Sequence, residues 1–257
     1  MISILSPAKK LNFEKIHRNC EESQPIFRKQ AAKLAKIASQ LDSSELSKLM
    51  KISSNLATLN KKRFDQFSAD PSPINLKQAA FVFAGDTYVG LSADKINPQN
   101  DTFFQNNIRI LSGLYGILRP FDLIQPYRLE MGSRLQTEEG SNLYKFWNNA
   151  LATALETDLK NHANKVLINL ASEEYFKAIN FSKNNFKVIT PKFFEIRNGD
   201  YKLISFFAKK ARGLMARFIV NNRLTKPDDI KDFNLEGYKF ESKANDDKNY
   251  IFSRKSD

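Results

Sequence analysis

Tyr127, Arg128 and Glu130 stand within four residues of one another and carry side chains that can transfer protons or bind anions. A carboxylate can serve as a general base, and an arginine beside it can orient that carboxylate or bind phosphate. Because Arg128 and Glu130 are two residues apart, they share one face of an extended strand. We treat Glu130, Tyr127 and Arg128 as candidate catalytic residues. A plain salt bridge is the alternative role for the Arg–Glu pair.

These residues belong to a glycine- and proline-rich segment, residues 113–132, that is too polar for a core strand and too broken for a helix. We expect a helix to end at 111–115, a turn at Gly116 and then an extended crossing held by prolines. Stiff loops with aromatic, guanidinium and carboxylate groups often carry binding sites, although some only connect two elements. Tyr115 and Arg119 are therefore further pocket candidates.

The chain is strongly basic: 40 lysines and arginines against 28 acidic residues give a net charge of +12 and a pI near 9.6. A polyanion is the obvious partner for such a protein, although solvated lysine faces produce the same excess in many enzymes. Residues 1–70 carry 13 basic and seven acidic residues, and 151–257 carry 20 and 14. The middle of the chain, 71–150, carries seven of each and is neutral.

A second basic segment, 201–227, holds seven basic residues and no acidic one. Its apolar spacing predicts a helix from Ala208 onward, with Gly213 on the polar face. Glycine costs about 1 kcal/mol against alanine in a helix, so Gly213 is expected to allow close approach of a backbone or a ligand. The cations predicted to line a basic cleft are Lys209, Lys210, Arg212 and Arg217.

Residues 42–67 are predicted to form two short helices around a tight turn. Asp42-Ser43-Ser44-Glu45 is a capping-box pattern, and the chain breaks at 52–56 before a second helix. Such a helix-hairpin-helix binds phosphate through backbone N–H groups, but the usual glycines are missing and a plain αα-corner is equally supported. The candidate DNA contacts are Lys51, Ser53, Ser54, Asn55, Lys61, Lys62 and Arg63, together with Lys9 after the first strand.

Cysteine and histidine usage excludes several classes of site. The single cysteine, Cys20, rules out an internal disulfide, and His17 and His162 are the only histidines. The sequence therefore has too few cysteines and histidines to favour a Cys/His metal site or a Ser-His-Asp catalytic triad. We expect neither a metal nor a cofactor. No secretion signal or membrane-length apolar run is present, so we expect a cytoplasmic protein with no membrane partner.

The remaining pattern predicts a mixed α/β (α+β) fold, 1–257, in a single domain with a central mixed sheet and flanking helices. Asn198-Gly199 between two apolar runs is a strong hairpin signal. Ser172 follows a buried strand and is a candidate helix cap or anion contact. The predicted strands are 2–5, 79–83, 166–170, 186–196, 201–207, 238–241 and 250–252, and the main predicted helices are 25–41, 100–111 and 143–160.

Six blocks spread along the chain resemble the YaaA family, bacterial proteins of the peroxide-stress response. They are residues 6–9, 49–57, 114–120, 125–132, 169–176 and 208–219. The resemblance implies a single-domain mixed α/β fold built around a basic cleft, a helix-hairpin-helix and binding of double-stranded DNA. It also associates the chain with lower unincorporated iron and less oxidative DNA damage.

Two functional hypotheses follow. The leading one is a DNA-binding protein of the oxidative stress response that holds duplex DNA mainly through phosphates and limits iron-dependent damage. The alternative is an enzyme that acts on a small anionic, nucleotide- or nucleobase-like ligand around Tyr127, Arg128 and Glu130. A glutamate beside Arg128 repels phosphate, so duplex binding alone does not explain this neutral loop. The two hypotheses are compatible.

Overall fold

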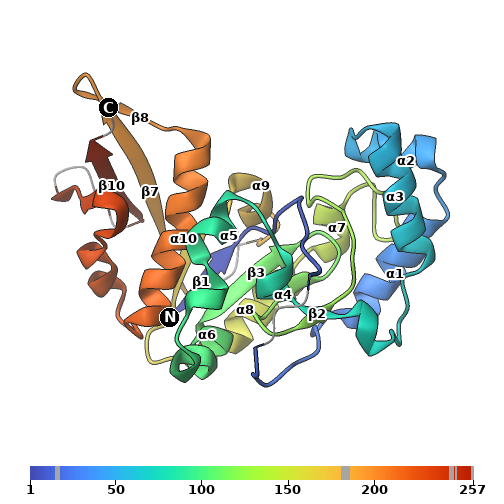
Figure 1. The fold of residues 1–257 in the computed structure, drawn as a ribbon, viewed down its shortest axis with the longest axis horizontal. Helices are drawn as coiled ribbons and strands as arrows, with labels where there is room; N and C mark the ends of the chain where they lie inside the picture. The colour runs from blue at the N-terminus through green and yellow to red at the C-terminus, as the bar shows by residue number, and fades with distance from the viewer. Residues whose placement is uncertain (15–17, 181–185, 243–245, 247, 256–257) are drawn as a thin grey trace.

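A mixed sheet organises the structure, a computed structural model that describes residues 1–14, 18–180, 186–242, 246 and 248–255 (Figure 1). Within these residues eight strands run in the order β4-β3-β1-β6-β7-β10-β9, and β8 pairs with β7. The five longer strands are parallel: β1 (Ile2–Leu5), β3 (Ile108–Ser112), β6 (Val166–Leu170), β7 (Lys187–Arg197) and β10 (Asn249–Lys255). The antiparallel strands are β4 (Gly116–Leu118), β8 (Asp200–Lys202) and β9 (Lys239–Phe240). The predicted mixed α/β class is confirmed.

Helices cover this sheet and extend it at one end. Figure 1 shows α1–α3 at one end of the molecule, β7–β10 at the other, and α5 and α10 in front of the sheet. A small second sheet pairs β2 (Lys77–Gln78) with β5 (Leu123–Ile124). The helices are α1 (Arg28–Ser39), α2 (Ser43–Met50), α3 (Ser54–Asp65), α4 (Ala79–Val82), α5 (Asp86–Leu91), α6 (Asp101–Asn107), α7 (Leu143–Trp147), α8 (Ala150–Lys160), α9 (Glu173–Phe176) and α10 (Ser205–Asn221). None of those in the described chain has the length and apolar character needed to cross a bilayer.

The predicted corner within 42–67 forms, with α2 and α3 as its two helices. Asp42 accepts a hydrogen bond from the Glu45 backbone N–H at 2.8 Å, and the Glu45 side chain accepts from the Asp42 N–H at 2.8 Å, so the capping box is confirmed. Helix α2 ends at Lys51 in a left-handed conformation (φ 53°). These features fit a plain αα-corner as well as a helix-hairpin-helix, so phosphate binding by this corner stays a prediction.

The expected helix through Ile108 to Tyr115 is wrong. Helix α6 ends at Asn107, and residues 108–112 form the fully buried strand β3, which pairs with β1. A helix does start near the expected cap at 100–102, but the apolar residues from Ile108 onward belong to the strand. Arg109 is buried in that strand because its guanidinium forms an ion pair with Asp158 (2.6 Å). Strand β3 then turns into β4, where Gly116 adopts a positive φ of 69°.

Other predicted elements were confirmed in part. Residues 79–82 form a helix rather than a strand, since a short buried apolar run suits either. The expected helix 143–160 breaks into α7 and α8 at Asn148 (φ 39°). The Asn198-Gly199 hairpin is confirmed by its two positive φ angles, but β8 ends at Lys202. Strands β9 and β10 pair as expected; residues 243–245 and 247 of their connection lie outside the described part.

Gly213 lies at a close crossing of α10 over α5, so its predicted place on a polar face was wrong. A Cβ on Gly213 would lie 1.8 Å from the Thr87 carbonyl oxygen, and one on Gly90 would lie 2.1 Å from the Lys210 carbonyl oxygen. Each glycine therefore admits the backbone of the other helix. Of the two reasons expected for a glycine here, the structure shows the close approach of another backbone.

We expect Gly213→Ala to lower the free energy of unfolding by at least about 2 kcal/mol because the new methyl group overpacks the crossing. Helix propensity alone would raise it by about 1 kcal/mol. Chemical denaturation of both proteins measures the difference. Gly85→Ala is the control, since its Cβ would meet only Ala8 Cβ at 3.3 Å. Equal or greater stability of Gly213→Ala would contradict the close crossing.

Candidate functional site

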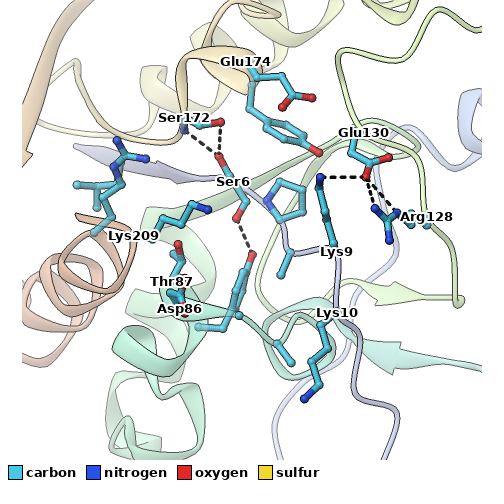
Figure 2. Close-up of a pocket in the computed structure, with 18 of the residues that line it drawn as sticks. Ser6, Lys9, Lys10, Asp86, Thr87, Arg128, Glu130, Ser172, Glu174 and Lys209 are labelled. Carbon is cyan, nitrogen blue, oxygen red and sulfur yellow. Dashed lines mark hydrogen bonds and ion pairs between the residues drawn. The ribbon is translucent and has the colours of Figure 1, made fainter. Parts of the chain in front are cut away.

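A cavity of about 600 Å³ opens at the carboxyl ends of β1 and β6 (Figure 2). The chain leaves β1 toward β3 on one side and leaves β6 toward β7 on the other, so the cavity lies at a topological switch point. Ligands of open α/β sheets bind at such points, and the volume is in the usual range for small-molecule sites. The lining residues are 6–10, 84–88, 127–130, 170, 172–175, 209 and 212.

Two serines from neighbouring strand ends are hydrogen-bonded at the middle of the cavity. Ser6 Oγ accepts from the Ser172 backbone N–H at 2.8 Å and donates to Ser172 Oγ at 3.2 Å. Tyr88 Oη donates to the Ser6 carbonyl at 3.0 Å and ties α5 to the same loop. Ser172 precedes α9, but its side chain makes no capping bond, so the predicted cap is wrong in that respect.

Glu130 lies at one end of the cavity with its two oxygens in different environments. Oε1 accepts from Arg128 Nε at 3.0 Å and also lies 3.6 Å from Lys9 Nζ. Oε2 is buried and has no hydrogen-bond partner in the described part of the chain. A buried acceptor without a partner is uncommon and requires an explanation. The expected Arg–Glu pair therefore forms through Oε1 and leaves Oε2 without a hydrogen-bond donor among the described residues.

The tyrosines behind Glu130 form a packed wall rather than a reactive group. Tyr127 Oη is hydrogen-bonded to Ser112 Oγ at 2.6 Å, and the ring packs edge-on against Tyr115 at 5.4 Å. Burial raises the pKa of Tyr127, so its hydroxyl stays protonated at neutral pH and is poorly suited to act as a base. Tyr115 does not line the cavity; its Oη accepts from the Gln125 N–H at 3.1 Å.

Helix α10 contributes two cations to the other end. Lys209 and Arg212 are one turn apart, and Figure 2 shows the Lys209 amine directed into the cavity toward Ser6. Burial lowers the pKa of Arg212. Within the described chain its guanidinium has neither an ion pair nor a hydrogen bond. A desolvated cation without a partner lowers stability, and an anion in the cavity would offset that cost.

The other predicted cations are distributed over different surroundings. Arg119 lies away from the cavity and binds Asp122 and the Gln24 carbonyl. Lys210 pairs with Glu236, and Arg217, although on α10, does not line the cavity. The structure thus brings together Lys9, Tyr127, Arg128, Glu130, Ser172, Lys209 and Arg212 from the predicted residues.

Arg63 on α3 does not line the cavity, but it feels the charge of Arg128, which does. Burial and then the charge of Arg128 lower the pKa of Arg63. Lys61 is neutralised by an ion pair with Asp65. Lys51 and Lys62 are exposed and have no acidic partner among the residues that the structure describes. Ser53, Ser54 and Asn55 are also exposed, and the Ser53 side chain does not cap the helix.

Several lining residues at the starts of short helices were not predicted from the sequence. Asp86 and Thr87 begin α5 and reach the cavity because α5 crosses α10. Glu174 Oε1 accepts from the Gly132 N–H at 2.9 Å and so connects α9 to the Glu130 loop. Gly85-Asp86-Thr87 follows a buried apolar run, and this pattern could have indicated a site. No local pattern indicated which other segments these residues meet in the cavity.

Comparison with known proteins shows the family. The sequence model of the "Peroxide stress protein YaaA" family matches residues 1–244. The chain belongs to that family. It is also 46% identical over 254 residues to a "UPF0246 protein" of Hahella chejuensis (strain KCTC 2396), and the match covers 99% of each chain.

Cys20 of this YaaA-family chain lies in surroundings that disfavour its thiolate form. Its thiol is partly buried and accepts a hydrogen bond from Gln78 Nε2 at 3.1 Å. Burial raises the pKa of Cys20, which reduces the reactive thiolate. Among the described residues, no three or more His, Cys, Asp and Glu residues are grouped so that they could hold a metal ion. His17 lies outside the described part.

We expect Arg212→Met to raise the free energy of unfolding of the ligand-free protein by about 1 kcal/mol, because it removes a desolvated charge without a partner. Arg109→Met is the matched control. It breaks the ion pair with Asp158 and should lower stability by about 2 kcal/mol or more. Urea denaturation measures both. If Arg212→Met destabilises the protein as much as Arg109→Met, its guanidinium already has a partner.

Proposed function

We propose that this YaaA-family chain binds duplex DNA through phosphates as its part in the peroxide-stress response. The observation that carries the proposal is the exposed start of α3. Its first-turn N–H groups have no side-chain cap, and Lys51 immediately precedes them. Lys62 lies in the last turn of the same helix, and neither lysine has an acidic partner in the described chain. The N-terminus of a twelve-residue helix with a free lysine just before it suits a phosphate, and Lys62 can contact a second phosphate farther along the helix.

A second observation supports an extended phosphate path rather than a single contact. Among the described residues Arg63 on α3 has one hydrogen bond, to Asn60 Oδ1 at 3.3 Å. Burial and the charge of Arg128, which lines the cavity, lower the pKa of Arg63. Lys9, with 70% of its side chain exposed, lines the same cavity. The two guanidinium groups repel each other, and a backbone phosphate between them would relieve that repulsion. The proposed DNA surface therefore runs from α3 to Lys9.

Contacts of this kind determine how the binding behaves. Phosphate contacts carry little sequence information, so the proposal implies weak base preference. Each neutralised phosphate releases condensed counterions, and about six contacts would make log K fall with log salt with a slope near −5. The Lys61–Asp65 and Lys210–Glu236 pairs reduce the contribution of two cations that the sequence analysis had included.

We expect Lys51→Gln/Lys62→Gln to weaken duplex binding and to reduce the salt slope by about 2, because two phosphate contacts are lost. Fluorescence anisotropy of a labelled duplex at several salt concentrations measures both quantities. Lys160→Gln/Lys226→Gln is the charge-matched control, since these exposed lysines lie far along the chain from α3. Equal loss in both variants would indicate general charge attraction instead of a surface at α3.

We extend the proposal to limiting iron-dependent damage by covering DNA. Supercoiled plasmid exposed to Fe(II) and peroxide should be nicked less when the chain is bound. Protection should disappear at salt concentrations that release the protein and should be reduced for Lys51→Gln/Lys62→Gln. Protection that persists when no DNA is bound would show that the chain acts on iron or peroxide and not by covering the duplex.

A further inference from the structure

The cavity contains two unfilled positions of opposite chemistry. At one end Glu130 Oε2 is a buried acceptor without a donor among the described residues. At the other end Arg212 is a desolvated cation without an acceptor in the same part of the chain, and Lys209 points into the space beside it. A ligand that satisfies both must carry an anionic group and, separately, a hydrogen-bond donor.

The free oxygen at the Glu130 end requires a hydrogen-bond donor and not the anionic part of such a ligand. Arg128 and Lys9 lie at Oε1, so the hydrogen-bonding capacity that remains on Glu130 is that of Oε2, which can only accept. An anion offers Oε2 no proton, whereas an N–H group would complete the missing hydrogen bond. The orientation of the ligand is therefore set, with its anion at Lys209 and Arg212.

Part of the wall between the two ends is apolar and aromatic, and Asp86, Thr87, Glu173 and Glu174 also line the cavity. Tyr88, Tyr127 and Tyr175 contribute buried rings, and Leu129 lines the same wall. Such a lining suits a flat heterocycle, because ring faces and aliphatic groups cover its surface without needing hydrogen bonds. Figure 2 places the hydroxyls of Ser6 and Ser172 between Lys209 and Glu130, where a sugar hydroxyl can exchange hydrogen bonds with them.

We propose that this cavity binds a nucleotide, with the phosphate at Lys209 and Arg212, the sugar near Ser6 and an N–H of the base donating to Glu130 Oε2. Inorganic phosphate would satisfy only the cationic end, and a free base would satisfy only Glu130. The nucleotide can be free, or it can be an unpaired unit of a strand, because Arg128 connects the cavity to the surface proposed for DNA. Binding of a free nucleotide does not depend on duplex binding.

The test is isothermal titration with GMP, UMP, the matching nucleosides, ribose 5-phosphate and inorganic phosphate. We expect at least one mononucleotide to bind ten-fold or more tightly than its nucleoside and than ribose 5-phosphate. Arg212→Met should remove the advantage over the nucleoside, and Glu130→Gln should weaken both mononucleotide and nucleoside about ten-fold. Arg217→Met, on the same helix but outside the cavity, and Lys51→Gln/Lys62→Gln should leave mononucleotide affinity unchanged.

A second arm distinguishes a free nucleotide from one in a strand. If the ligand is part of a strand, a duplex with one unpaired nucleotide binds more tightly than the fully paired duplex, and Glu130→Gln removes only that difference. Equal affinity for ribose 5-phosphate and the mononucleotides would overturn the proposal, since it would reveal a simple phosphate site. So would the absence of both mononucleotide binding and a preference for the unpaired duplex. Circular dichroism of each variant separates loss of binding from loss of fold.

Discussion

The close crossing of α5 and α10 is the constraint on which the candidate site depends. Gly90 and Gly213 let the two backbones approach at distances that no side chain allows. The crossing brings Asp86 and Thr87, at the start of α5, to the same cavity as Lys209 and Arg212 on α10. Because Tyr88 also binds the Ser6 carbonyl, the same helix pair is attached to the end of β1. Two glycines far apart in the sequence thus position one wall of the site.

Buried charges in this structure fall into two groups that differ in how they are satisfied. Glu195 is bound by Arg254 and by Tyr238 Oη, and Arg254 lies 4.7 Å from the rings of both Phe207 and Tyr238. Arg109 is similarly completed by Asp158. In contrast, Arg212 and Glu130 Oε2 remain incomplete within the described chain. Most buried polar groups in proteins are satisfied, and Glu130 and Arg212 line the same cavity, so we infer that a ligand completes them. Ser3 Oγ, which is also buried without a partner among the described residues, does not line that cavity.

The electrically neutral middle of the chain, residues 71–150, supplies one end of the cavity. Glu130 and Arg128 come from residues 71–150, and the cations at the other end of the cavity come from α10. A surface that bound only phosphates would have no use for a carboxylate. A site for a whole nucleotide needs cations for the phosphate at one end and a hydrogen-bond acceptor for the base at the other. The charge of Arg128, which lines the cavity, acts on Arg63 of α3, so the two proposed binding regions are linked electrostatically.

The sequence by itself determined the mixed fold class, the α2–α3 corner, the hairpin at Asn198-Gly199 and most of the charged residues around the cavity. These depend on local signals: a capping box, a turn dipeptide, or residue types in a short segment. It misplaced β3, because the Arg109–Asp158 pair that buries an arginine in a strand joins residues 49 positions apart. It also misplaced Gly213, whose reason for being glycine is a helix from another part of the chain. Only the tertiary structure decided that Arg119 lies outside the cavity, that Lys61 and Lys210 are neutralised, and that Arg212 is left unpaired, because pairing depends on distances between segments that no local pattern encodes.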